Sequence, residues 1–298
     1  MSTPLEVCNL SKSFKGDFAV KDLSFSTQPG QCLALLGPNG AGKTTAIKCL
    51  YGFLTPDSGE IYYFGRSFCK NRDWVSSQIG VLSQEDNLDY DFSVLQNLLI
   101  YFRYFNLKPD LKKGTELLQT FDILEKKDAM PITLSGGMKR RLQMARSLVN
   151  SPKILFLDEP STGLDPQARH HLWKIIFRLK ARGILILLTT HYMDEAEKLA
   201  DNIILIDKGK KLVEGDFKIL KEKHFHGKMV LTPENGDVTR SLKELNIDYS
   251  IFLEQVQFNC PPEGLSRFLE LNPQTPYTVR EPNLEDLFLK LTGTYLRE

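Results

Sequence analysis

A glycine-rich segment near the start of the chain has the spacing of a phosphate-binding loop. Residues 37–44 read Gly-Pro-Asn-Gly-Ala-Gly-Lys-Thr and fit the pattern G-x-x-x-x-G-K-[ST]. In this pattern the glycines let successive backbone N–H groups turn toward a phosphate, and the following helix adds the positive end of its dipole. Lys43 then reaches the β- and γ-phosphates, and the Thr44 hydroxyl binds Mg²⁺. The segment follows an apolar run and precedes a helix-like stretch, so we predict a nucleotide site here.

Two adjacent acids, Asp158 and Glu159, directly follow an apolar run at residues 154–157. Such a pair can be an ordinary solvated strand end, but a phosphate loop in the same chain favours a role in catalysis. Asp158 would hold Mg²⁺, directly or through water, and Glu159 would polarise an attacking water molecule.

A second anion-binding segment lies at Ser135, Gly136 and Gly137, where a stretch with helical spacing begins. A serine and two glycines at a helix start offer a hydroxyl and free backbone amides to an anion. One cradle suffices for one nucleotide, so we interpret the second as part of a site that another copy of the chain completes. The alternative is an ordinary helix with a serine cap.

The elements that position these residues are short and apolar, and each run ends abruptly at polar residues. This alternation of buried strands with helices predicts a mostly parallel α/β sheet. The expected strands are 31–36, 79–82, 154–157 and 184–188. The expected helices between them are 44–54, 137–148 and 166–179.

The last part of the chain has a different texture and contains none of these motifs. We expect strands at 228–232, 249–253, 255–259 and 277–280, with helices at 238–245 and 263–271. The order β-α-β-β-α-β is the ferredoxin-like split pattern. A closing helix at 284–291, capped by Asn283, would follow. We therefore expect two domains, residues 1–220 and a small α+β domain at 221–298. The apolar face of the closing helix comprises Leu284, Leu287, Phe288 and Leu291.

Composition excludes several classes of protein. The chain has 298 residues, of which 42% are hydrophobic and 25% charged, as in globular proteins. Its 38 basic and 37 acidic residues leave no electrostatic footprint for nucleic acid. Five cysteines without a C-x-x-C pair fit neither a disulfide framework nor a zinc site. The N-terminus does not resemble a signal peptide and no apolar run is long enough to span a bilayer, so we expect a cytoplasmic protein.

Taken in order, the motifs resemble those of the ATP-binding subunit of an ABC transporter. The resemblance covers about residues 4–215. It implies a P-loop NTPase core of ABC ATPase type with a helical subdomain at about 86–150, and it implies ATP and Mg²⁺ as cofactors. The motifs that carry it are 37–45, Gln84, 134–138, 155–159, 161–165 and His191.

The resemblance implies a role for each motif. Glu159 is the general base, Gln84 contacts Mg²⁺ and the attacking water, and His191 holds the γ-phosphate. Ser135 and Gly137 contact the γ-phosphate of a second copy in a head-to-tail dimer. The implied metal ligands are Thr44, Gln84 and Asp158. The implied cofactor-binding residues are Phe14, Gly37, Pro38, Asn39, Gly40, Ala41, Gly42, Lys43, Thr44, Thr45, Ser135, Gly136, Gly137 and Asp165.

Two positions depart from the common family pattern. Phe14 stands where the ring that stacks on adenine is often a tyrosine, and we expect little consequence because the π-face remains. Gln96 stands where a glutamate is common, which would alter contacts to the membrane partner. The resemblance also implies that Asp165 lies at the seam between the two copies of the dimer.

A narrower resemblance points to the NodI and DrrA group of exporter ATPases. Residues 134–142, 188–197 and 282–293 carry it, while 86–89 and the surroundings of Tyr104 favour NodI. It implies export of a lipid, a saccharide-lipid or a drug-like molecule through a separate integral membrane permease. The chain would then lie peripherally on the inner face of the cell membrane.

The alternative is a soluble ATPase of the same type that acts on DNA or ribosomes. A DNA-repair ATPase would need a long coiled coil between Thr44 and Leu134, but too few residues separate them. A ribosome-acting protein with two cassettes would show a second phosphate loop, which the chain lacks.

Two further hypotheses concern segments outside the nucleotide motifs. An aromatic-rich segment at 90–105 either forms the core of the helical subdomain or lines a groove for a short permease helix. The domain after residue 220 would stabilise or regulate the dimer, with ligand sensing as the alternative.

Overall fold

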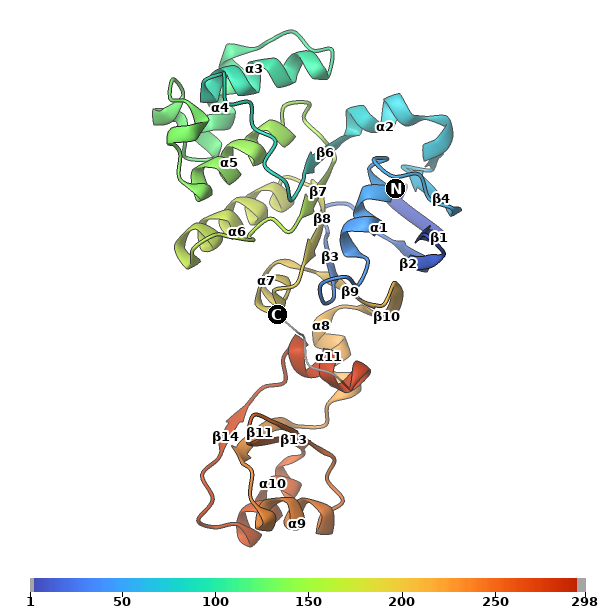
Figure 1. The fold of residues 1–298 in the computed structure, drawn as a ribbon, viewed down its shortest axis with the longest axis vertical. Helices are drawn as coiled ribbons and strands as arrows, with labels where there is room; N and C mark the ends of the chain where they lie inside the picture. Colours follow the sequence, from blue (N-terminus) through green and yellow to red (C-terminus); the bar gives the residue numbers. More distant parts are fainter. Residues whose placement is uncertain (1–2, 294–298) are drawn as a thin grey trace. The chain divides into compact units, whose positions relative to one another are not determined.

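The computed structural model describes residues 3–293. By their contacts these residues divide into two units, with the boundary between Glu214 and Gly215 (Figure 1). The expected boundary after residue 220 falls inside helix α8 (Phe217–His224), which contacts helix α11 (Leu284–Thr292) of the second unit. The Lys290 ammonium also donates to the His224 carbonyl. The whole of α8 therefore belongs with the second unit.

A six-stranded sheet forms the centre of the first unit. Its strands β3, β7 and β8 are buried along their whole length, which explains why their sequences are apolar without alternation. The pairs β3–β8, β3–β9, β7–β8 and β6–β7 are parallel, as predicted. The order across the sheet is β10 (Lys210–Gly215), β9 (Asn202–Asp207), β3 (Cys32–Leu36), β8 (Leu185–Thr190), β7 (Ile154–Asp158) and β6 (Ile79–Leu82).

Helices cover both faces of this sheet. In Figure 1, α1 lies on one side of the strands and α6 and α7 lie on the other. Helix α1 ends four residues earlier than predicted, because Tyr51 caps it and Gly52 takes a φ of 85°. The helices around the sheet are α1 (Lys43–Leu50), α2 (Arg72–Gln78), α6 (Pro166–Ala181) and α7 (Met193–Leu199).

A second, antiparallel sheet in the first unit escaped the sequence analysis. Its strand β1 has register shifts against both neighbours, so its side chains do not alternate cleanly between buried and exposed. Leu5, Val7 and Leu23 of this sheet pack with Ile47 and Leu50 of α1 in one core. The order is β2 (Asp17–Ser26), β1 (Leu5–Phe14), β4 (Ser58–Tyr63) and β5 (Arg66–Ser67).

Three helices between β6 and β7 form the helical part that was expected at about 86–150. Helix α3 begins with a capping box in which Ser93 and Gln96 bond each other's backbone. All three helices contact one another. They are α3 (Val94–Tyr104), α4 (Leu111–Thr120) and α5 (Gly136–Ser147).

The second unit has the predicted element order β-α-β-β-α-β. Its four strands pair only in the antiparallel sense, with Leu253 and Glu254 at positive φ in the turn between β12 and β13. Val230, Phe258 and Phe268 lie in its core. The sheet order is β12 (Tyr249–Phe252), β13 (Gln255–Cys260), β11 (Lys228–Pro233) and β14 (Thr278–Arg280), with α9 (Gly236–Glu244) and α10 (Pro262–Leu271).

Helix α11 closes the second unit. Its predicted cap is present: the Asn283 side chain accepts from Asp286 N, and Asn283 N donates to Asp286 Oδ2. Asp286 also receives two bonds from Arg280 of β14, at 2.5 and 2.7 Å. Leu284 and Leu287 of the predicted apolar face are fully buried. A single carboxylate thus joins the start of α11 to the edge of the sheet.

Two findings bear on the expectations from composition. All five cysteines are free thiols. Within residues 3–293 the longest helix, α6, is too short and too polar to cross a bilayer, and no other described helix meets that requirement.

We predict that Asp286→Ala destabilises the second unit by about 1–3 kcal/mol, because it removes half of the capping box and leaves Arg280 without its bidentate partner. Urea unfolding of the full chain, followed by circular dichroism, measures the effect. Glu285→Ala is the control, since Glu285 is an exposed acid in the same helical turn. Equal losses in the two variants would contradict this account of Asp286.

Candidate functional site

The predicted phosphate loop joins β3 to α1 and is closely surrounded by backbone. A Cβ atom on Gly42, which has a φ of 104°, would lie 2.0 Å from the Ala19 carbonyl oxygen. A Cβ on Gly37 would lie 2.1 Å from the Ile206 carbonyl oxygen. Only glycine fits at these two positions, so the loop keeps a shape in which its amides stay available.

The Lys43 side chain folds back over this loop. Its ammonium donates to the carbonyls of Gly37 and Pro38 at 2.9 and 3.0 Å, and it lies 3.8 Å from Glu159 Oε1. Burial lowers the pKa of Lys43, while the nearby carboxylates of Glu159 and Asp158 act in the opposite direction. A buried cation held by carbonyl dipoles is well suited to bind an anion that enters the loop.

Asp158, at the end of β7, has one satisfied oxygen and one that is not. Its Oδ1 accepts from the hydroxyls of Thr44 at 3.2 Å and Thr189 at 2.5 Å. Its Oδ2 is buried, and nothing in residues 3–293 donates to it. Burial is the main cause of the raised pKa of Asp158, and the two hydroxyl bonds oppose it.

These oxygen atoms fit a magnesium ion. The unpaired Oδ2 belongs to the carboxylate whose Oδ1 accepts from the Thr44 hydroxyl, and hard oxygen donors are the ligands that Mg²⁺ takes. The described residues hold no cluster of three or more His, Cys, Asp or Glu side chains suited to a metal. That agrees with the usual Mg²⁺ site, in which one or two protein ligands act with water and substrate phosphates.

Two other predicted residues, Gln84 and His191, meet at the Glu159 carboxylate. Its Oε2 accepts from Gln84 Nε2 at 3.3 Å and from Thr162 Oγ1 at 3.1 Å, and its Oε1 lies 3.3 Å from His191 Nδ1. Gln84, Glu159 and His191 follow β6, β7 and β8, whose carboxyl ends share one edge of the sheet. Glu159 also has a φ of 46°, a strained value for a residue with a side chain.

The other predicted residues lie apart from this cluster. Phe14, on the hairpin between β1 and β2, is 48% exposed, with the Lys12 ammonium 5.6 Å from its ring centroid. Ser135 caps α5 by accepting from Met138 N, and Asp165 caps α6 in the same way. Among the described residues, no hydrogen bond or ion pair joins these capping side chains to the phosphate loop. They are exposed at the surface, open to a second chain.

The sequence analysis missed three residues that hold the cluster in place. Thr162 and Thr189 bond the two acids, but hydroxyl residues are too common for such roles to be visible in a sequence. Arg140 of α5 is buried and donates to the backbone carbonyls of Asp158 and Glu159. Arg140 lies within residues 134–142, which carry the narrower resemblance, but an arginine in a helix is usually solvated, so no buried role was assigned to it.

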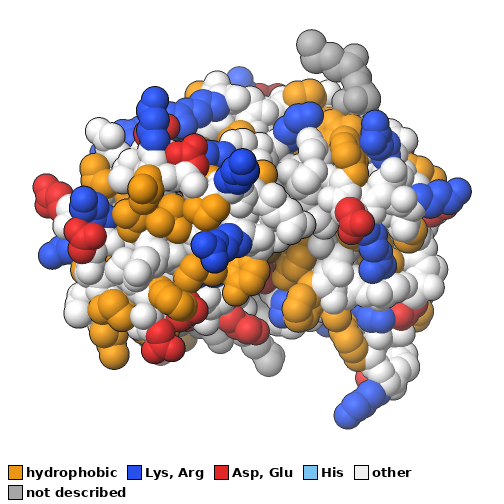
Figure 2. All heavy atoms as spheres, turned by 90° about the horizontal axis from the view of Figure 1, so that it is seen from above, with side chains coloured by type: hydrophobic (Ala, Val, Ile, Leu, Met, Phe, Trp, Pro, Cys, Tyr) orange, Lys and Arg blue, Asp and Glu red, His pale blue; other side chains and the backbone are white. Residues whose placement is uncertain are grey.

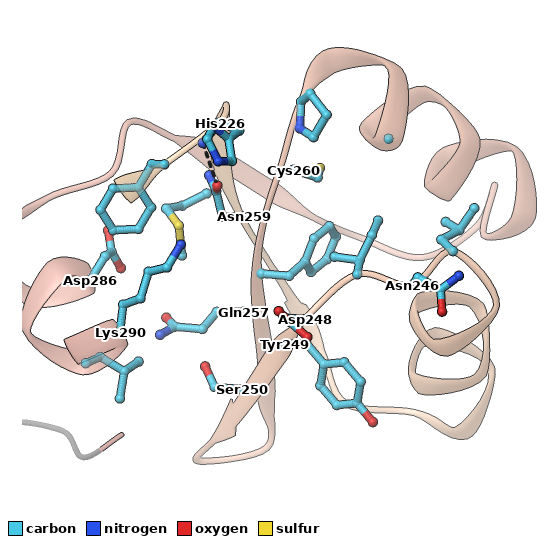
Figure 3. Close-up of a pocket in the computed structure, with 18 of the residues that line it drawn as sticks. His226, Asn246, Asp248, Tyr249, Ser250, Gln257, Asn259, Cys260, Asp286 and Lys290 are labelled. Carbon is cyan, nitrogen blue, oxygen red and sulfur yellow. Dashed lines mark hydrogen bonds between the residues drawn. The ribbon is translucent and has the colours of Figure 1, made fainter. Parts of the chain in front are cut away.

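A cavity in the second unit contains none of the predicted site residues. It has a volume of about 820 Å³ and is bordered by β12, β13, α10 and α11. Figure 3 shows Gln257, Ser250 and Lys290 on one side of β13 and Tyr249 on the other. Asn259 accepts from His226 N at 3.0 Å, the bond drawn in Figure 3.

Comparison with known proteins agrees with this geometry. Residues 20–162 match the family described as ABC transporter. The chain is 41% identical to a protein of Burkholderia orbicola named Nod factor export ATP-binding protein I, and the alignment covers 99% of both chains. A protein of the same name from Bradyrhizobium diazoefficiens is 40% identical over 97% of this chain and 96% of that one.

Solved structures give the same result for the first unit. An ATP-binding subunit of an ABC transporter superposes with a TM-score of 0.67 at 27% identity, covering 74% of this chain and 93% of that one. The ADP conformation of an ATP-binding cassette superposes with a TM-score of 0.66 at 27% identity, covering 72% and 91%. The chain has the phosphate loop and the paired acids, and its relatives align with it over nearly their whole length. The chain therefore belongs to the ABC transporter family, as an ATP-binding subunit that hydrolyses ATP.

Proposed function

We propose that this chain powers export through a separate membrane permease, with ATP closing a head-to-tail dimer of two copies. The observation that carries the proposal is the meeting of Gln84 and His191 on Glu159, next to Lys43 and Asp158. A base, an ammonium and an orphaned carboxylate oxygen at one strand edge are what metal-assisted attack of water on a phosphate requires.

The residues of the site would act in the following way. The β- and γ-phosphates replace the loop carbonyls as partners of Lys43. Thr44, Asp158 and Gln84 would hold Mg²⁺, which neutralises charge on the phosphates. Glu159 takes a proton from water, and His191 orients the γ-phosphate. The exposed Ser135 and the partly buried Gly137 of a second copy complete the site.

The exported molecule in this proposal is a lipid, a saccharide-lipid or a drug-like compound. Two observations support an exporter of this kind. The named Nod factor export relatives align over both units rather than over the first unit alone. The second unit also has an additional sheet that the nucleotide site does not use. The chain would work at the cytoplasmic face of the membrane, attached through the permease.

We predict that Glu159→Gln lowers ATP turnover by roughly 10²- to 10⁴-fold while ATP binding persists, because the shape remains but the basic oxygen is lost. With Mg-ATP the variant should then remain a dimer, which light scattering measures. Glu85→Gln removes the same charge from an exposed neighbour of Gln84 and should turn over normally. Normal turnover by Glu159→Gln would disprove the general-base assignment.

A groove beside α3 is the surface that we propose for the permease. It has a volume of about 310 Å³, and its borders include Tyr90, Tyr101 and Tyr104. The Arg146 guanidinium stacks 3.9 Å from the centre of the Tyr101 ring and keeps that wall in place. Figure 2 looks onto the end of the first unit that carries α3, where hydrophobic side chains form patches between Lys and Arg. The aromatic-rich segment at 90–105 therefore serves both purposes. Phe102 is only 2% exposed and belongs to the core, whereas the three tyrosines border the groove.

We predict different results for two aromatic residues of α3. Phe102→Ala should cost about 3–5 kcal/mol because it opens a cavity. Tyr104, which is 73% exposed, should tolerate alanine within about 0.5 kcal/mol. Tyr104→Ala should nevertheless lose stimulation of its ATPase by the membrane partner, measured after reconstitution in vesicles. If stimulation is unchanged in Tyr104→Ala and in Tyr90→Ala, the groove is not the docking surface.

For the second unit we propose a contribution to pairing of the two copies that does not depend on ATP. A chain that ends at Glu214, where the division between units falls, should still bind ATP. Its nucleotide-free self-association should weaken by roughly tenfold or more, which corresponds to about 1.4 kcal/mol or more of lost contact energy. Analytical ultracentrifugation without nucleotide decides this, and equal affinities for both forms would exclude the role.

A further inference from the structure

Arg140 is a buried cation that carbonyl groups surround. Its side chain is 8% exposed and lies on α5, one turn after the helix begins. It donates to the carbonyls of Ser83 at 2.6 Å, Asp158 at 3.0 Å, Glu159 at 2.9 Å and Pro160 at 2.9 Å. Within residues 3–293 no carboxylate forms a salt bridge with it, so backbone dipoles take the place of a counter-ion.

The charge on this guanidinium persists at neutral pH. Burial lowers the pKa of Arg140 to about 10, and the surrounding acids, Asp158 first among them, act against that shift. A buried cation that loses its hydrogen-bonding partners pays a large desolvation cost. The planar fork of arginine, with five N–H groups, reaches several carbonyls at once, which the single ammonium of lysine cannot do.

The four carbonyls belong to the backbone that carries the catalytic cluster. Ser83 and Gln84 directly follow β6, while Asp158 is the last residue of β7 and Glu159 and Pro160 follow it. One guanidinium therefore sets the backbone on both sides of the position where the attacking water would lie. A shift of Arg140 moves these two backbone segments together, because separating them would leave the buried charge without hydrogen-bonding partners.

The same helix also begins at the segment that would face a second copy. Ser135 caps α5 and is exposed, and α5 is a continuous helix from Gly136 past Arg140. Five residues of helix span only about 7 Å and behave as a rigid rod. A contact made at Ser135 is thus mechanically connected to the guanidinium of Arg140.

We propose that Arg140 is a positioning residue that couples the ATP bound between two copies to the catalytic groups of each chain. In this proposal, contact of Ser135 and Gly137 with the partner's ATP fixes α5, and Arg140 then sets the backbone of Gln84 and Glu159 for attack. The proposal rests on the head-to-tail dimer of the proposed function.

The first test asks whether substitution of Arg140 lowers ATP turnover without lowering ATP binding. Arg140→Lys keeps the charge but cannot bridge four carbonyls, so its kcat should fall by roughly 10- to 100-fold, the usual effect of misplacing catalytic groups by about 1 Å. ATP binding and Mg-ATP-driven dimerisation, measured in the Glu159→Gln background, should stay within about threefold of the parent. A fall in ATP affinity equal to the fall in kcat would show a general structural role and overturn the proposal.

The adjacent residue provides a matched control. Arg141 lies on the same helix, but its guanidinium donates to the carbonyl of Asp122 at 3.1 Å and not to the backbone beside Gln84 or Glu159. Arg141→Lys is the same chemical change one position along and should keep wild-type kcat. If the two variants lose turnover equally, the effect belongs to the helix in general and the assignment of Arg140 is wrong.

The second test measures coupling in a double-mutant cycle with Ser135→Ala. In the wild type, Ser135→Ala should lower kcat because the contact with the partner's ATP is lost. In the Arg140→Lys background that loss should be smaller by roughly fivefold or more, since the route from Ser135 to Glu159 is already broken. Strictly multiplicative losses in kcat would overturn the proposal.

One further variant covers the case in which the Arg140 variants fail to fold. Gln143 accepts from Arg140 at 3.0 Å and donates to Asp86, so Gln143→Met removes one support and leaves the guanidinium in place. Its kcat should fall several-fold with ATP binding retained, and a wild-type kcat would count against the proposal. Failure of Glu159→Gln to dimerise with Mg-ATP would instead refute the proposed function itself, so the two ideas fail separately.

Discussion

Burial of charge beside the carboxyl ends of β6, β7 and β8 is the constraint on which the rest of the structure depends. Lys43, Arg140, Asp158 and Glu159 are all less than 9% exposed. Each charge is costly to remove from water unless dipoles or opposite charges compensate it. Loop carbonyls and Glu159 surround Lys43, while four backbone carbonyls hold Arg140. The compensation is incomplete at Asp158 Oδ2, which is buried and receives no hydrogen bond from the described residues.

This constraint explains the arrangement of the elements around the site. Parallel strands with buried faces bring their carboxyl ends to one edge, which is where side chains from distant parts of the chain can meet. Glu159 accepts its φ of 46° because Arg140, Thr189 and Thr162 hold its backbone and side chain from three sides. Strain of this kind persists only where the surroundings impose it.

The second unit is held together mainly by apolar burial rather than around buried charges. It buries an ordinary apolar core around Val230 and Phe258, and the Arg280–Asp286 pair joins the sheet edge to α11. Its cavity of about 820 Å³ between β13 and the surrounding helices is of the size that small-molecule sites have. The charged side chains at that cavity include both acids, such as Asp248 and Asp286, and bases, such as Arg267 and Lys290.

Local patterns in the sequence determined the phosphate loop, the paired acids, the parallel strands and the caps at Ser135 and Asn283. These features depend on residues that are near one another in the chain, such as glycine spacing and apolar runs. The antiparallel sheet of β1 and β2 was missed because its register shifts disrupt the alternation of buried and exposed residues. The end of α1 was misplaced because Gly52 stops the helix within an apolar stretch.

The meeting of Gln84, Glu159 and His191, and the burial of Arg140 beneath them, were decided only by the tertiary structure. The sequence showed that Gln84 and His191 follow apolar runs, but the contact of both with one carboxylate depends on which strands are neighbours. The role of Arg140 depends on backbone carbonyls, which every residue has and which no sequence pattern can distinguish. Side-chain types and short spacings are written in the sequence, whereas the partners of a buried charge are set by how distant strands and helices pack together.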